Sequence, residues 1–350
     1  MPQLSELGEA DVLDRLLAHR RAGAVEIVGP GDDAAVTNLT GRLVSTADML
    51  VENEDFTRTW LDWHALGVKA AAQNLADVCA MGALPHGLLV SLAVPDTTEV
   101  ADLEALFQGI VAEADRAGQA LRTAVPVIGG DLSSSGLIVV GLTALGSAEA
   151  GHAITRAGAR PGDGIWLAGT LGRAAAGLDL LFAGARPDEL PGELTALIDA
   201  QLAPQPDYAA IAALIAAGGP EGPVASAMID ASDGLSTDLG RIAKASGVHA
   251  DLDRAALDPL LAPLLSAAEY VIAAQGNNAK AESAQAWSDA EALALHWVLD
   301  GGEDHGFVAS AAHPGPHPVG WRRIGEMQAG SGVSLDGAPV PTSGFSHFGK

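Results

Sequence analysis

Residues 29–36 read GPGDDAAV, and this short stretch is the best starting point for interpreting the chain. Residues 29–31 form a tight turn, in which glycine permits backbone angles and close approaches that other residues do not. Asp32 and Asp33 follow the turn directly, and two adjacent carboxylates can ligate a hard cation such as Mg²⁺. The alternative is an exposed turn, because Gly, Pro and Asp are common turn residues. Four further acidic stretches, STADML, NLADV, GGD and DASDG, favour the metal-binding interpretation.

The composition indicates a folded, acidic protein. The 350 residues suffice for two domains with a large core, and 48% are hydrophobic while 18% are charged. The formal net charge of −25 argues against nucleic-acid binding, which requires a basic face. An acidic balance fits a protein that binds cations, although a solvated acidic surface is its more common cause. Because no apolar run reaches the roughly 18 residues of a membrane span, we expect no membrane partner.

The small numbers of lysine and cysteine residues exclude further kinds of site. The chain has only four lysines and no GxxxxGK[ST] motif, so a P-loop is excluded. Cys79 is the only cysteine, which excludes an internal disulfide and favours a reducing compartment. The N-terminal residues are acidic and amphipathic, unlike a signal peptide. We therefore expect a cytoplasmic protein.

The first half of the chain alternates helices and strands, with its acidic residues at turns and strand ends. Apolar spacing predicts helices over 4–21, 62–82 and 98–118, and strands over 42–48, 87–93, 126–131 and 136–146. This pattern is typical of an α+β domain that carries a polar site on its loops. Because the polar, turn-rich segment 148–163 marks a boundary, we predict domains over 1–150 and 151–350.

The second half contains another acidic turn between a strand and a helix. In residues 225–239, ASAMIDASDGLSTDL, a strand ends at Ile229, and the turn holds Asp230, Ser232 and Asp233. The stretch is not an EF-hand, since the ligand spacing is wrong. One acid could cap the following helix, but two acids that flank a serine favour a binding site.

The remaining segments of this half carry fewer signals. We predict a strand over 164–169 and helices over 170–184 and 206–217. The Ala-rich residues 265–292 read as a surface helix or loop insertion without chemistry. We interpret His305, in LDGGEDH, as an exposed histidine without a metal-binding role.

Two places in the first half present candidate metal ligands. Thr46 and Asp48, at the end of a predicted strand, can supply oxygen ligands, although side chains that cap the strand end are the alternative. Asp77 lies near the C-terminal end of a helix, where the helix dipole disfavours a carboxylate, so it requires a counter-charge. Lys69 could supply that charge in a structural pair, but we prefer a metal ion.

Carboxylates on loops, combined with a single cysteine, favour Mg²⁺ over softer metals. Several Mg²⁺ ions are suited to phosphoryl transfer, in which they neutralise charge on the attacking and leaving oxygens. The acidic motifs therefore favour an enzyme that acts on phosphate groups.

The motifs resemble a known family in content and order. GDDAAV, STADMLVENEDF, KAAAQNLADVCAMGA, GGD, TRAGARPGD, MIDASDGLSTDL and LDGGEDH occur in the order found in thiamine-monophosphate kinases, which belong to the aminoimidazole-ribonucleotide synthetase superfamily. The resemblance implies an α+β/α/β fold of two domains, with an N-terminal mixed sheet that pairs across a homodimer and a C-terminal α/β domain. It further implies an ATP-dependent kinase that uses several Mg²⁺ ions to convert thiamine monophosphate into thiamine diphosphate.

The resemblance also implies roles for individual residues. For Mg²⁺ it implies Asp33, Thr46, Ala47 through its backbone oxygen, Asp48, Asp77, Asp131, Asp230 and Asp233. For ATP it implies Gly130, Asp131, Arg156 and Ser232. For the acceptor it implies Glu303 and Phe345, together with Asp55, where the family usually carries a histidine that contacts the substrate. This last departure puts the recognition of the acceptor in question.

The expected mechanism requires no catalytic side-chain base. The second pKa of a phosphate monoester is about 6, so the acceptor oxygen is already a nucleophile at neutral pH. Direct in-line transfer of the γ-phosphoryl group would then depend on positioning and charge neutralisation. The alternatives are another ATP-using enzyme of the same superfamily and a non-catalytic nucleotide or divalent-ion sensor that has kept the fold.

Overall fold

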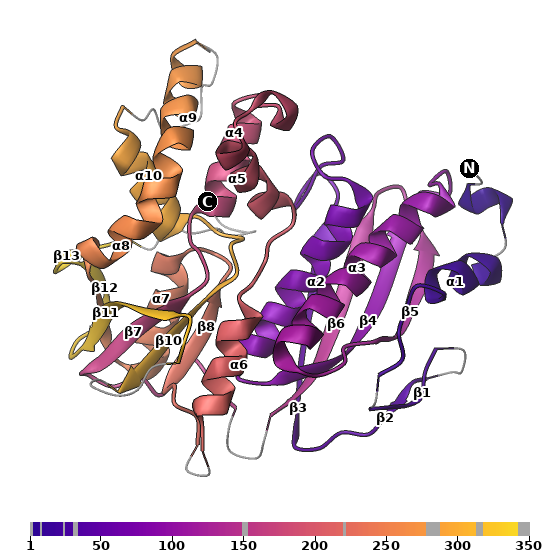
Figure 1. The fold of residues 1–350 in the computed structure, drawn as a ribbon, viewed down its shortest axis with the longest axis horizontal. Helices are drawn as coiled ribbons and strands as arrows, with labels where there is room; N and C mark the ends of the chain where they lie inside the picture. The colour runs from indigo at the N-terminus through magenta and orange to yellow at the C-terminus, as the bar shows by residue number, and fades with distance from the viewer. Residues whose placement is uncertain are drawn as a thin grey trace. The chain divides into compact units, whose positions relative to one another are not determined.

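The computed structural model describes residues 3–7, 9–23, 25–30, 34–148, 153–219, 222–277, 288–312 and 318–341. The chain forms two compact units, unit 1 (Met1–Ala153) and unit 2 (Ile154–Lys350), which Figure 1 shows in indigo to magenta and in magenta to yellow. The division falls inside the turn-rich segment 148–163.

Unit 1 is built on a four-stranded mixed sheet in the order β3-β6-β4-β5. Its strands are β3 (Arg42–Val51), β4 (Leu84–Val94), β5 (Val127–Ser134) and β6 (Val139–Ala148). β4 and β5 are parallel, whereas β6 is antiparallel to both β3 and β4. Helices α2 (Trp63–Ala80) and α3 (Val100–Leu121) pack together against the sheet (Figure 1). The smaller elements are η1 (Leu4–Glu6), α1 (Glu9–Leu17), β1 (Glu26–Val28) and β2 (Val36–Thr37).

Two local features explain how α2 and β3 are placed. The Asp62 carboxylate accepts a hydrogen bond from the Ala65 N–H at 2.7 Å, which caps the start of α2. In β3, side chains alternate between the two faces of the sheet, as the period of a strand requires. Thr46 and Asp48 are half-buried on one face, whereas Leu43 and Met49 are exposed on the other.

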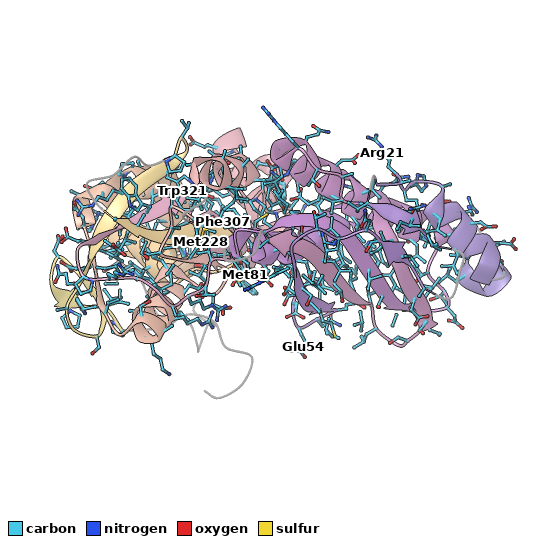
Figure 2. All side chains as sticks on the ribbon, turned by 90° about the horizontal axis from the view of Figure 1, so that it is seen from below. Arg21, Glu54, Met81, Met228, Phe307 and Trp321 are labelled. Atoms are coloured by element: carbon cyan, nitrogen blue, oxygen red, sulfur yellow. The ribbon has the colours of Figure 1, made fainter. Side chains whose placement is uncertain are left out.

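Unit 2 is built on a seven-stranded sheet in the order β13-β12-β9-β11-β7-β10-β8. The strands are β7 (Asp163–Ala168), β8 (Ala227–Ala231), β9 (His249–Leu252), β10 (Gly306–Ala312), β11 (Trp321–Gln328), β12 (Gly332–Leu335) and β13 (Ala338–Pro339). The helices are α4 (Arg173–Phe182), α5 (Gly192–Leu202), α6 (Tyr208–Ala217), α7 (Leu235–Ser246), α8 (Arg254–Leu261), α9 (Leu265–Asn277) and α10 (Ala290–Asp300), with short turns η2 (Pro187–Glu189) and η3 (Ala262–Leu264). β10 lies antiparallel between β7 and β8. Met228, Phe307 and Trp321 are buried in this sheet's core (Figure 2).

The structure corrects two expectations about secondary structure. The predicted helix over 4–21 is instead the turn η1 followed by α1, which ends at Leu17. The interpretation of 265–292 as a surface insertion is wrong for its first part, because Ala267, Ala268 and Val271 of α9 are buried. Alanine-rich helices lack the contrast between apolar and polar faces on which that interpretation depended. Residues 278–287 lie outside the described residues.

One described stretch, Arg254–Ala274, has the length and hydropathy of a membrane span. It comprises α8, η3 and most of α9, and Asp258 and Glu269 interrupt its apolar residues. Its apolar side chains at Leu257, Leu264 and Val271 are buried within the protein. We therefore attribute its hydropathy to packing in the core of unit 2.

Candidate active site

Two loops of unit 2 contact each other through their backbones. The DASDG loop (residues 230–234) joins β8 to α7, and the GGED loop (residues 301–304) joins α10 to β10. The Glu303 N–H donates a hydrogen bond to the Ser232 carbonyl at 2.8 Å. A Cβ atom on Gly302 would lie only 2.3 Å from the same carbonyl oxygen, so only glycine allows this approach. A backbone hydrogen bond therefore joins Ser232, which is predicted to bind ATP, to Glu303, which is predicted to bind the acceptor.

The environment of Asp230 shows a role for His305 that the sequence did not indicate. Both side chains are buried, and His305 Nδ1 lies 3.2 Å from Asp230 Oδ2. The expectation of an exposed histidine is therefore wrong. His305 and Glu303 both have positive φ, at 50° and 73°, which is uncommon for residues other than glycine. Such backbone strain is concentrated at functional sites.

Asp233 is held by two residues of α7. Its carboxylate forms an ion pair with Arg241 at 2.7 Å, and its N–H donates to Asp238 Oδ2 at 2.9 Å. Asp238 is fully buried and also pairs with Arg241. Burial raises the pKa of Asp238 to about 7, against the hydrogen bond from Asp233 and the charge of Arg241. The sequence analysis missed this group, although the i,i+3 spacing of Asp238 and Arg241 was a visible signal.

Asp304 attaches the GGED loop to the start of α4. Its carboxylate accepts hydrogen bonds from Thr170 Oγ1 at 3.1 Å, Arg173 N–H at 3.1 Å and Ala174 N–H at 3.2 Å. The positive end of the helix dipole also favours a carboxylate at this position. Burial raises the pKa of Asp304 to about 6, and the three hydrogen bonds oppose this rise. Asp304 therefore caps the start of α4 and ties the GGED loop to it.

In unit 1, three predicted metal ligands lie where α2 packs on β3. The Thr46 hydroxyl donates a hydrogen bond to Asp77 Oδ2 at 2.6 Å. The Asp48 N–H donates to Asn74 Oδ1 at 3.1 Å, one helical turn before Asp77. The alternative of a structural pair between Lys69 and Asp77 stays open, because Lys69 is buried in the same helix.

The other predicted residues of unit 1 are not grouped with these three: Ala47 and Asp55 lie on β3 and in the turn after it, and Gly130 and Asp131 lie on β5, at the opposite edge of the sheet. Ala47 follows Thr46 on β3 with its side chain on the opposite, exposed face. Gly130 and Asp131 are exposed on β5, and the Ser133 hydroxyl donates to Asp131 at 3.3 Å. The Asp55 carboxylate accepts a hydrogen bond from the Val51 N–H at 2.7 Å. Asp55 therefore closes the turn that follows β3, a local role that requires no substrate.

Arg156 lies in the segment of unit 2 that precedes β7. Its side chain is exposed, and its carbonyl accepts a hydrogen bond from Ser246 Oγ at the end of α7. Asp33 and Phe345 lie outside the described residues. The role predicted for each of these three residues stays a prediction.

The donor atoms fit Mg²⁺ in kind. The predicted ligands are carboxylates and a hydroxyl, which suit a hard cation. Within the described part of the chain, no three His, Cys, Asp or Glu side chains are grouped closely enough to hold a metal ion by themselves. Mg²⁺ is usually bound by one or two carboxylates together with substrate phosphates and water, so a site of this kind needs no complete protein cage.

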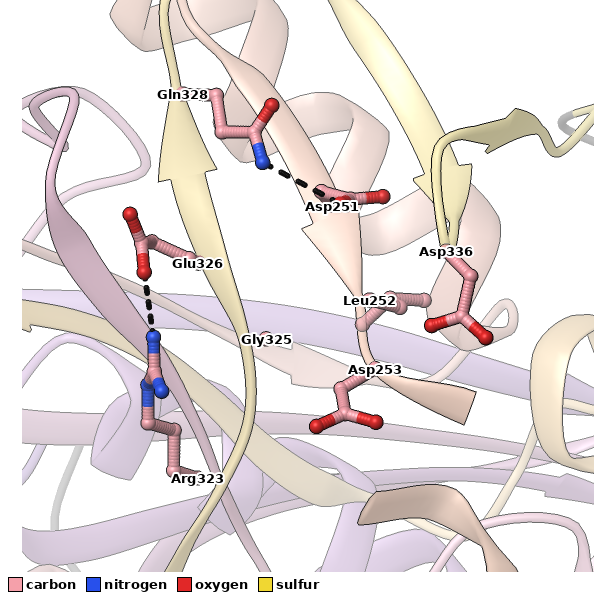
Figure 3. Close-up of a pocket in the computed structure, with 8 residues that line it drawn as sticks. All are labelled: Asp251, Leu252, Asp253, Arg323, Gly325, Glu326, Gln328 and Asp336. Carbon is pink, nitrogen blue, oxygen red and sulfur yellow. Dashed lines mark hydrogen bonds and ion pairs between the residues drawn. The ribbon is translucent and has the colours of Figure 1, made fainter. Parts of the chain in front are cut away.

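A separate depression of about 270 Å³ opens beside β9 and β11 in unit 2 (Figure 3). The acidic side chains that line it all have partners within the protein. Asp251 accepts hydrogen bonds from Gln328 and the Gly337 N–H. Asp253 caps α8, and Glu326 forms an ion pair with Arg323. Among the predicted metal, ATP and acceptor residues that the structure describes, none lines it. We therefore do not assign the depression to the active site.

We compared the chain with families and proteins of known sequence. A model of the AIR synthase related protein, N-terminal domain, matches residues 31–148. The thiamine-monophosphate kinase of Mycobacterium tuberculosis (strain CDC 1551 / Oshkosh) is 39% identical over 352 residues, covering 100% of this chain and 94% of that protein.

Solved structures agree over nearly the whole chain. Thiamine-monophosphate kinase from Stenotrophomonas maltophilia K279a superposes with a TM-score of 0.74 at 29% identity, covering 95% of this chain and 98% of that one. The structure of AaThiL complexed with AMPPCP and TMP gives a TM-score of 0.69 at 29% identity, with 99% of both chains covered. The predicted two-domain fold is confirmed, and the chain belongs to the thiamine-monophosphate kinase family.

Proposed function

We propose that this chain catalyses the ATP-dependent phosphorylation of thiamine monophosphate to thiamine diphosphate, a step of thiamine diphosphate biosynthesis. One observation carries the proposal: the Glu303 N–H donates to the Ser232 carbonyl at 2.8 Å. This bond fixes a residue predicted for the acceptor beside a residue predicted for ATP, as a transfer between two bound phosphates requires. The homologous AaThiL, crystallised with AMPPCP and TMP, supports the same pair of ligands.

We propose that each unit supplies carboxylates for Mg²⁺ on its own. Asp230 and Asp233 in unit 2, and Asp48 and Asp77 in unit 1, supply the hard oxygen donors that Mg²⁺ prefers. When bound, Mg²⁺ neutralises negative charge on the transferring phosphoryl group. The residues of the chain keep these donors in place: Thr46 orients Asp77, and His305 orients Asp230.

The remaining steps need positioning and charge, and no side-chain base. The acceptor phosphate monoester has a second pKa of about 6, so its oxygen is largely deprotonated at neutral pH. Asp304 anchors the GGED loop to the start of α4. The contact of Glu303 with the acceptor is part of our proposal. The in-line geometry and the assistance of Arg156 are our proposals, and they follow from the need to align two anions.

The test is release of ADP with thiamine monophosphate as the acceptor and MgCl₂ present. We expect turnover that depends on both substrates and is abolished by excess EDTA. ADP release without thiamine monophosphate, or with a different phosphate acceptor only, would support another ATP-using enzyme of the superfamily. Binding of nucleotide without any ADP release would support a sensor.

We also propose that unit 1 pairs with a second copy of itself. The outer face of the sheet exposes Leu43 and Met49 on β3, at 58% and 60%. Among the described strands, β3 pairs on one side only, with β6, so its other edge is available. Exposed edge strands are normally protected, and two-fold symmetric dimers are the commonest oligomers, so a second copy of unit 1 is the cover that we propose.

Replacing Leu43 by Asp tests this dimer. We expect the wild type to have the mass of a dimer in light scattering, and the variant to dissociate about tenfold or more readily, because the interface would bury a charge. Val319→Asp is the matched control, since Val319 is 88% exposed in unit 2 and its replacement should leave the mass unchanged. A wild-type monomer at micromolar concentration would contradict the proposal.

A further inference from the structure

Arg241 forms an ion pair with Asp233, the carboxylate that the proposed function assigns to a metal ion. Its guanidinium pairs with Asp233 at 2.7 Å and, at the same time, with Asp238 on the same face of α7. A carboxylate bound to Arg241 offers fewer lone pairs to a cation, and the positive charge of Arg241 repels that cation. The guanidinium and Mg²⁺ are therefore competitors for Asp233.

The two carboxylates differ in how easily they can leave the arginine. The Asp238 side chain is fully buried, whereas 28% of the Asp233 side chain and 37% of the Arg241 side chain are exposed. Separating Arg241 from Asp238 would leave this fully buried side chain without one of its hydrogen-bonding partners, which is costly whether the group is charged or neutral. Separating it from Asp233 leaves both groups in reach of solvent, so Asp233 is the exchangeable partner.

Backbone hydrogen bonds would allow Asp233 to change its partner by a movement of its side chain alone. The Asp233 N–H donates to Asp238 Oδ2 at 2.9 Å, and the carbonyl of Ser232 accepts from the Glu303 N–H. These two bonds hold the DASDG loop on both sides whatever partner the Asp233 carboxylate has. A rotation of the Asp233 side chain is then sufficient to change partners.

We propose that Arg241 is the resting counter-ion of Asp233. It holds this carboxylate in the nucleotide-free protein and gives it up to the cation of a bound metal–nucleotide complex, while it stays paired with Asp238. The proposal depends on the proposed function, because the cation is the one that accompanies ATP.

The test measures binding of Mn²⁺, as a probe for Mg²⁺, by the electron paramagnetic resonance signal of free Mn²⁺ at a fixed concentration of AMPPCP. In Arg241→Met we expect Mn²⁺ to bind about two- to fivefold more tightly, the factor expected when a partly exposed ion pair no longer competes. Arg323→Met is the matched control, because Arg323 forms an ion pair of similar exposure with Glu326 at 2.6 Å. The control should leave Mn²⁺ binding unchanged.

A double-mutant cycle separates competition from a general electrostatic effect. If Arg241 acts through Asp233, Arg241→Met should not tighten Mn²⁺ binding in an Asp233→Asn background. Tightening that persists there would overturn the proposal, because it would come from the removed charge alone. Should the methionine variant not fold, Arg241→Lys replaces it, and we expect tightening by a smaller factor because lysine cannot bridge both carboxylates.

The remaining outcomes distinguish the two proposals. Mn²⁺ binding that is unchanged or weaker in the Arg241 variant would show a structural arginine and overturn the exchange. A wild type that binds Mn²⁺ and AMPPCP but does not phosphorylate thiamine monophosphate would contradict the proposed function, and the cycle would still decide the role of Arg241. A wild type that binds no Mn²⁺ with AMPPCP would overturn both.

Discussion

Replacing Asp77 by asparagine is expected to lower kcat by about 100-fold or more, the usual loss for a group that stabilises transition-state charge. Asparagine keeps an oxygen that can accept the hydrogen bond of Thr46 Oγ1, so the packing of α2 on β3 should persist. What the variant loses is the negative charge, and with it the attraction for Mg²⁺. Steady-state kinetics at saturating ATP and thiamine monophosphate, over a range of MgCl₂ concentrations, measures the effect.

Asp62→Ala is the matched control in the same helix. The Asp62 carboxylate caps the start of α2, so its loss should lower the free energy of unfolding by about 1 kcal/mol. We expect kcat to stay near that of the wild type, because Asp62 has no predicted contact with metal or substrate. If Asp77→Asn instead behaves like Asp62→Ala, with lower stability and unchanged kcat, the structural pairing with Lys69 explains Asp77.

Replacing Gly302 by alanine is expected to lower kcat by about 100-fold, because a misplacement of about 1 Å at a reacting centre has this effect. The added methyl group would lie 2.3 Å from the Ser232 carbonyl oxygen, which cannot move aside without shifting the DASDG loop. The hydrogen bond from Glu303 to Ser232 would be lost together with this shift. The substitution changes no charge and no metal ligand, so it tests the interlock of the two loops by itself.

Gly192→Ala gives the matched control for this substitution. Gly192 begins α5, where an added Cβ meets no atom within 4 Å, and alanine there should be neutral or stabilise by up to about 1 kcal/mol. Comparing kcat and the melting temperature of both variants separates lost alignment from lost stability. A Gly302→Ala enzyme with wild-type kcat would show that the two loops do not need their close approach for catalysis.

Local patterns were sufficient for the elements that carry the candidate site. The apolar spacing around Asp77 predicts a helix over 62–82, and α2 spans Trp63–Ala80. Alternation along β3 likewise follows from its residues, and Ser232 and Asp233 lie in the predicted turn between β8 and α7, although β8 extends to Ala231 and therefore includes Asp230. These features depend on residues close together in the chain, and periodicity reports on such residues directly.

Local patterns failed where a residue's environment comes from distant parts of the chain. His305 looks like an isolated polar residue after two acids, but the pairing of β10 with β8 brings it against Asp230. α9 looks like an insertion because its alanines bury against other helices without forming an apolar stripe.

The sequence by itself determined the order of the elements, the acidic motifs and the family, since each can be read along the chain. The tertiary structure alone decided which distant segments meet: the GGED loop with the DASDG loop, and Asp304 with the start of α4. The physical reason is that burial, counter-charges and backbone hydrogen bonds are set by strand order and loop packing. Residues 70 or more positions apart, such as Ser232 and Glu303, become neighbours only after the sheet has formed.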